Sequence, residues 1–146
     1  MITNLETLAA MAGAQEVALS GWNGEEIRVR LKKPSLYAMA AEGRIPNPLL
    51  GVAEGLFMGN QDAIKRASLD DTAKTLRMMA KAALVEPTWE ELETAGIELT
   101  DQQISEIYAF VVGGAAQLAR FRGIMRNTAG GDGQRHELQG VGTAGR

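Results

Sequence analysis

The chain has 146 residues, of which 45% are hydrophobic and 23% charged, which suits one domain with a hydrophobic core. It contains no cysteine, which excludes disulfide bonds, thiolate metal sites and cysteine nucleophiles. Its formal net charge of −3 argues against general nucleic-acid binding. No stretch approaches the about 20 apolar residues of a membrane span, and residues 1–8 lack the basic run of a secretory signal.

The first predicted element is a short helix that ends at Gly13. Thr3 and Glu6 have the spacing of a capping box, in which each residue bonds the other's backbone amide. Three apolar side chains share one face of this helix: Leu5, Leu8 and Ala12.

A β-hairpin is predicted next, over about residues 16–32. Val17 and Leu19 lead into Asn23-Gly24, a dipeptide that favours a two-residue type I′ turn. Beyond the turn, apolar and basic side chains alternate with period two: Ile27, Val29 and Leu31 against Arg28, Arg30 and Lys32. The apolar set is expected to face the core, and the basic set solvent.

The rest of the chain is predicted to be helical. Asn47-Pro48 is typical of an N-cap followed by proline at the first helical position. Ser68, Thr88 and Thr100 are each followed three residues later by an acidic residue or glutamine, which is the capping-box spacing. These signals predict helices over residues 35–42, 48–58, 69 to before 87, 88–96 and 100–126.

The last of these helices is the longest, and its apolar stripe covers about three heptads. Such a stripe serves either an intramolecular core or an oligomeric coiled coil. Within it, Gly113-Gly114 indicates either a closely packed neighbour or a bend. Residues 127–146 contain six glycines and no amphipathic period, so we expect a disordered tail. The stripe consists of Ile104, Ile107, Tyr108, Val111, Ala115, Leu118, Phe121 and Met125.

Catalytic and metal-binding groups are scarce in this sequence. The only histidine, His136, lies in the glycine-rich tail, where nothing would orient it or exclude water. Five acidic residues lie in first helical turns, where the helix dipole favours them: Asp70, Asp71, Glu90, Glu91 and Glu93. We therefore expect a mainly α (α+β) domain over residues 1–126 that is not an enzyme and holds no metal or cofactor.

Basic residues cluster in two places. Arg28, Arg30, Lys32 and Lys33 form either a solvated strand face or a contact patch for anions. A second group follows the long stripe, where cations complement the C-terminal dipole of a helix or anchor a partner: Arg120, Arg122 and Arg126.

The most unusual local sequence is the elbow, residues 43–50, with the sequence Gly-Arg-Ile-Pro-Asn-Pro-Leu-Leu. Its two prolines restrict the backbone and bring Ile45, Leu49 and Leu50 into one small region. This elbow is either a corner between helices or a docking surface. The candidate partner-binding residues are Leu36, Arg44, Ile45, Pro46, Asn47, Pro48, Leu49, Leu50 and Phe57.

The elbow, together with the strand and residues 33–36 before it, resembles the tail assembly chaperones of long-tailed bacteriophages and prophages. Residues 85–88 and 97–104 are similar to that family in order and spacing, as is the helix over residues 5–13. The resemblance covers roughly residues 3–125.

The resemblance implies a helper protein that binds the tape-measure protein and recruits tail-tube subunits. It implies action in the host bacterial cytoplasm, absence from the mature virion, and either a homo-oligomer or a complex with a frameshifted, extended form. No nucleic acid or membrane is expected as a partner. The alternatives are a structural head–tail connector or tail completion protein, and a small DNA-binding regulator, which the acidic balance disfavours.

Overall fold

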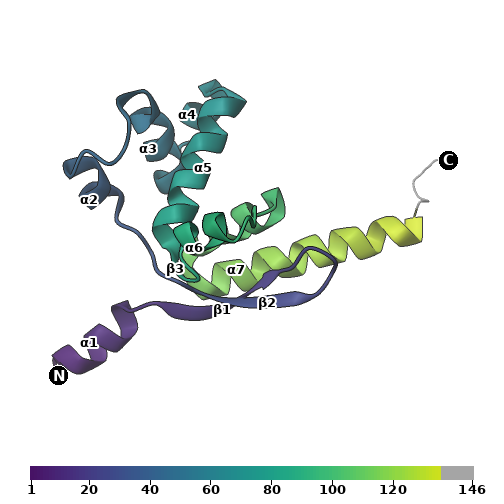
Figure 1. Ribbon diagram of the computed structural model, residues 1–146, viewed down its shortest axis with the longest axis horizontal. Coiled ribbons are helices and arrows are strands. Elements are labelled where there is room, and N and C mark those ends of the chain that lie inside the picture. Colours follow the sequence, from purple (N-terminus) through teal and green to yellow (C-terminus); the bar gives the residue numbers. More distant parts are fainter. Residues whose placement is uncertain (136–146) are drawn as a thin grey trace.

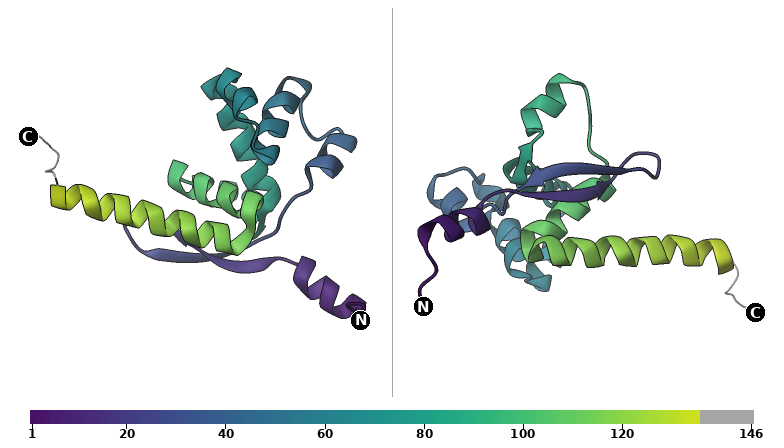
Figure 2. Two further views of the ribbon diagram at one scale, coloured as in Figure 1. Left: turned by 180° about the vertical axis from the view of Figure 1, so that it is seen from behind. Right: turned by 90° about the horizontal axis from the view of Figure 1, so that it is seen from below.

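The computed structural model describes residues 1–135, apart from the side chains of Gln61 and of residues 127–135. It is mainly helical with one antiparallel sheet, which confirms the predicted α+β class. Figures 1 and 2 show the sheet running along one side of the long C-terminal helix, with the remaining helices beyond it and the N-terminal helix apart. The sheet has the order β1 (Gln15–Ser20), β2 (Glu26–Leu31), β3 (Leu84–Glu86).

The N-terminal helix α1 (Leu5–Ala12) is confirmed, but its N-cap is Asn4 and not Thr3. The side-chain oxygen of Asn4 lies 2.8 Å from the amide nitrogen of Thr7 and accepts its hydrogen bond. None of the α1 residues is buried. Figure 1 shows this helix extending from the start of β1 away from the helical body. The apolar face of α1 therefore packs on no core in the described part of the chain.

The predicted hairpin is confirmed, with Val17 opposite Val29 and both side chains buried. Its turn differs from the prediction, because the loop spans residues 21–25 instead of two residues. Gly24 has a φ of +91°, which glycine adopts without steric cost. The loop is closed by a hydrogen bond of 2.6 Å that the amide of Gly21, its first residue, donates to the carbonyl oxygen of Glu25.

The third strand, β3, was not predicted. It pairs with β2 through Leu31 and Leu84 and through Arg30 and Glu86, with an irregularity between the two pairs. Three residues are too few to display the period-two alternation that marks a half-buried strand.

The region after the hairpin begins with the helix predicted over residues 35–42, and Ser35 is its N-cap: the Ser35 Oγ accepts from the amide of Ala38 at 3.1 Å. Asn47, by contrast, makes no capping hydrogen bond. The chain there forms a 3-10 turn, η1 (Asn47–Leu49), because the amide of Leu49 donates to the carbonyl of Pro46 at 2.8 Å. The α-helices of this region are α2 (Leu36–Ala41), α3 (Leu50–Met58) and the unpredicted α4 (Gln61–Arg66).

The next two helices, α5 (Leu69–Ala83) and α6 (Trp89–Thr94), begin at the predicted caps. Ser68 Oγ accepts from the amide of Asp71 at 3.0 Å. At α6 the capping box is reciprocal: Thr88 Oγ1 accepts from the amide of Glu91 at 3.1 Å, and Glu91 Oε1 accepts from the amide of Thr88 at 2.8 Å.

The last helix, α7 (Asp101–Arg135), starts at the predicted Thr100 capping box but is not straight. Gly114 has a φ of 78° and a ψ of −168°, which lie outside the helical range. Glu106 Oε2 lies 3.8 Å from Arg122 Nε, whereas a continuous helix from residue 106 to residue 122 would rise about 24 Å. The chain therefore folds back at Gly114 into two arms, residues 101–113 and 115–135, which lie side by side in Figure 2.

The second arm runs to Arg135, past the domain boundary expected at residue 126. Residues 127–135, expected to begin a disordered tail, are helical, because a helix that has already nucleated extends at the gain of one hydrogen bond per residue. The remaining tail residues, 136–146, including His136, lie outside the described residues.

The main hydrophobic core lies between the sheet and α3, α5 and α7. Its most buried large apolar side chains are Leu19, Leu31, Met79, Ile107 and Phe110. Phe110 does not belong to the predicted stripe, which the fold of α7 at Gly114 divides between two arms. A second, smaller cluster consists of Met39, Ile45, Leu49 and Ala53.

Candidate functional site

The elbow is a structural corner whose apolar side chains are largely internal. Ile45 and Leu49 are only 4% and 7% exposed, and they pack in the smaller cluster with Met39 and Ala53. Gly43 has a φ of +70°, a conformation that favours glycine where α2 ends. Ile45 and Leu49 therefore stabilise the corner in this conformation and do not present a docking surface.

The other candidate partner-binding residues divide into two groups. Leu36 and Phe57 are half-buried, and Phe57 packs against the main core. The outer surface of the elbow is formed by the exposed residues Arg44, Pro46, Asn47, Pro48 and Leu50. Of the nine predicted residues, only Arg44 lines a groove between the elbow and α5.

The groove lies between the elbow and α5 and has a volume of about 490 Å³. Its apolar lining contains Met78 from α5, which is half-buried, and Met39 from α2, which is only 2% exposed and belongs to the smaller cluster. Its polar lining contains Arg44. Methionine is flexible and polarisable, so it adapts to apolar partners of different shape. The complete lining, called the methionine groove below, is Lys32, Met39, Arg44, Met78, Lys81, Ala82, Leu84 and Glu90.

The polar lining of the methionine groove is predominantly basic, with three cations and one carboxylate. Lys81 Nζ lies 3.7 Å from Glu90 Oε2, and Arg44 Nε lies 2.8 Å from Glu42 Oε1, which is outside the groove. Lys32 has no carboxylate partner within 4 Å among the described residues. This lining favours an apolar ligand that also carries acidic groups.

Sequence reasoning placed Met39 and Met78 in helices and identified Arg44 as a candidate. It could not find the groove itself, because the groove needs α5 beside the elbow, and residues 39 and 78 are far apart along the chain. The available signal was the high methionine content, with seven in the chain. That signal does not say which methionines meet.

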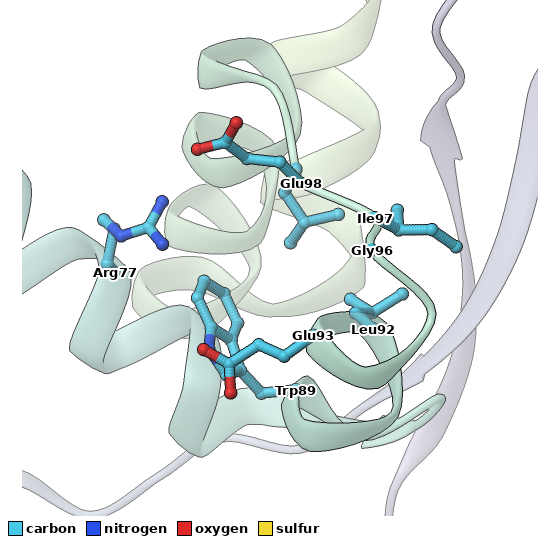
Figure 3. Close-up of a pocket in the computed structure, with 8 residues that line it drawn as sticks. Arg77, Trp89, Leu92, Glu93, Gly96, Ile97 and Glu98 are labelled. Carbon is cyan, nitrogen blue, oxygen red and sulfur yellow. The ribbon is translucent and has the colours of Figure 1, made fainter.

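A second cleft, of about 350 Å³, lies between α5, α6 and the loop after α6. Figure 3 shows Arg77, Trp89, Glu93 and Glu98 around its opening. The guanidinium carbon of Arg77 lies 5.1 Å from the centre of the Trp89 ring, which is within the range of a cation–π contact. Arg77 thus occupies the face of the only aromatic side chain lining the cleft. No nucleophile or histidine lines it.

The most polar part of the interior is centred on Glu106, whose side chain is fully buried. Its carboxylate accepts hydrogen bonds from the amide of Ser20 at 2.8 Å, from Ser20 Oγ at 2.6 Å and from Gln102 Nε2 at 3.0 Å. The guanidinium of Arg122 approaches it from the second arm of α7. These contacts join the hairpin to both arms of α7. Because the Glu106 side chain is fully buried and its oxygens accept from these donors, a substrate has no access to it.

Arg122 also reaches Glu26 Oε2 at 3.3 Å, and its side chain is only 12% exposed. The predicted role of Arg122 at a helix C-terminus is therefore wrong: α7 continues to Arg135, and Arg122 pairs with carboxylates beside it.

The basic face of the hairpin is paired as well. Arg28 Nε lies 2.6 Å from Glu16 Oε2, and Arg30 Nε lies 3.2 Å from Glu86 Oε1. The hydrogen bond and the charge of Arg28 hold the pKa of Glu16 below its ordinary value. These pairs reduce the charge that this face offers to an anion.

Two further observations concern the described residues alone. No group of three or more histidine, cysteine, aspartate or glutamate side chains there is arranged to hold a metal ion. No helix there has the length and apolar character needed to cross a membrane.

Burial raises the pKa of the Tyr108 phenol, which donates a hydrogen bond to the carbonyl of Leu56 at 2.8 Å and so ties α7 to α3.

Comparisons of this chain with protein-family models, with curated proteins and with solved structures each find no match.

Proposed function

We propose that this chain is a tail assembly chaperone of a long-tailed bacteriophage or prophage. In this role it binds an apolar helical segment of the tape-measure protein and recruits tail-tube subunits, in the host cytoplasm and without remaining in the virion. The proposal combines the family resemblance over residues 3–125 with one structural observation, the methionine groove beside the elbow.

The methionine groove supports the proposal through its chemistry. A tape-measure protein exposes apolar helical surface until the tail tube closes around it, so it needs a temporary cover. An amphipathic helix binds by laying its apolar face into an apolar groove, and the half-buried Met78 is a side chain that adapts to many such helices. Lys32, Arg44 and Lys81 would select segments that carry acidic residues beside the apolar face.

Co-expression with the tape-measure protein encoded beside this chain tests the proposal. We expect the tape-measure protein to remain soluble and to co-purify with the chain, whereas alone it aggregates. An unchanged soluble fraction with no co-purification would contradict binding.

Mass spectrometry of purified phage particles separates a chaperone from a structural part of the virion. The proposal expects the chain to be absent from mature particles. Stoichiometric copies in those particles would instead support a head–tail connector or tail completion protein.

A further inference from the structure

The helix α1 presents an apolar surface that packs on none of the residues that the structure describes. Leu5 is 81% exposed, Leu8 48% and Met11 66%, at helical spacings of three residues. An isolated helix of eight residues is marginal in water, because its nucleation cost outweighs the few hydrogen bonds that it forms. A packing surface outside its own chain would stabilise α1.

The methionine groove offers an apolar surface of complementary charge. Within α1 the only charged side chain is Glu6, in the first turn, and the helix has no basic residue in its last turn. Of the cations that line the groove, Arg44 pairs with Glu42 and Lys81 with Glu90, whereas Lys32 has no carboxylate partner within 4 Å among the described residues. A docked α1 would place its apolar face on the half-buried Met78 and Ala82, and Glu6 beside Lys32.

We propose that α1 of one copy occupies the methionine groove of a second copy, and that α1 of the second copy occupies the groove of the first. This inference rests on the proposed function, because it assigns the same groove. The occupant is a second copy because α1 leaves the groove of its own chain open and points away from the helical body (Figures 1 and 2). A reciprocal exchange covers both surfaces at once and closes as a two-fold dimer.

The exchange would also regulate partner binding. A tape-measure helix and α1 compete for one groove, so partner binding would release α1 and dissociate the dimer. The free chaperone would thereby protect its own apolar surfaces until a partner arrives.

Chemical cross-linking distinguishes exchange between chains from docking within one chain. The chain has no cysteine, so a single introduced cysteine is the only thiol. Ala12→Cys marks α1, and Glu90→Cys marks the groove. We expect an equal mixture of the two variants to form cross-linked heterodimers with a short bismaleimide. Cross-links found only within the chain of the A12C/E90C double variant, with no dimer, would overturn the proposal.

Sedimentation equilibrium of the full chain gives an independent test with matched variants. Leu5 and Leu69 are each the first residue of a helix and are 81% and 85% exposed, and aspartate is favourable at both positions. We expect Leu5→Asp to weaken the dimer about tenfold or more, because each dimer loses two apolar contacts. Leu69→Asp should leave the dimer unchanged.

A monomeric wild-type chain at about 100 μM, a concentration at which even micromolar affinity would populate the dimer, would overturn the exchange. An equal effect of the two substitutions would overturn it as well. Both experiments use this chain alone, so their failure leaves tape-measure binding intact. Conversely, a dimer that forms without tape-measure co-purification would reject only the proposed function.

Discussion

Arg122 Nε lies 3.8 Å from Glu106 Oε2, although a continuous helix would hold these two residues about 24 Å apart. The contact exists because α7 folds back at Gly114, midway between them. Through Ser20 the same carboxylate holds the end of β1. One buried acidic residue therefore joins the hairpin to both arms of α7.

Replacing Gly114 with alanine tests the conformation at this fold. Its φ of 78° with a ψ of −168° is essentially restricted to glycine, so G114A should lower the free energy of unfolding by about 1–3 kcal/mol. Gly123 in the second arm has no positive φ and open space at its Cβ position. The control G123A should stabilise the protein by about 0.5–1 kcal/mol. Urea unfolding measures both, and a neutral G114A would contradict the fold-back.

Removing the charge of Arg122 should leave the Glu106 carboxylate buried with neutral donors only. We expect R122M to reduce the free energy of unfolding by about 3 kcal/mol. R120M, on the exposed side of the same arm, should change it by less than about 0.5 kcal/mol. In a double-mutant cycle, E106Q/R122M should cost less than the sum of the single variants. Additive costs would show that the two side chains do not interact.

The Glu16–Arg28 pair makes a prediction about pH. Arg28 holds the pKa of Glu16 below 4.5, so the pair stabilises the hairpin above the pKa of Glu16 in the unfolded chain. This contribution is lost as the pH falls through the lower, folded pKa. In an NMR titration of the Glu16 carboxyl carbon, R28M should raise the pKa towards 4.5. R44M, which removes only the pair with Glu42, should leave it unchanged. A Glu16 pKa insensitive to R28M would reject the pair.

The sequence predicted those features that local chemistry determines. The caps at Ser68, Thr88 and Thr100 form because a side-chain oxygen lies within reach of an amide three residues away. The hairpin follows from period-two alternation. The elbow was identified from its prolines, but its composition could not decide that Ile45 and Leu49 point inward.

Features that depend on distant partners could not be predicted. Gly113-Gly114 indicated a bend or a close contact, but only the pairing of Glu106 with Arg122 shows that the second arm folds back towards the first. The strand β3 exists because Leu31 offers it a pairing edge, and Leu84–Glu86 alone has no strand signature. The methionine groove likewise needs Met39 and Met78 on separate helices.

The most direct measurement of the central claim is a calorimetric titration of a soluble peptide, taken from an apolar helical segment of the tape-measure protein, into three forms of this chain. Ala82→Phe fills the methionine groove, while Ala73→Phe makes the same change on α5 about 13.5 Å away along the helix. We predict that wild type and A73F bind equally and that A82F binds at least about tenfold more weakly, with its unfolding midpoint unchanged. Equal affinity of all three forms would contradict the groove as the binding site, and no binding to wild type would contradict the proposed function.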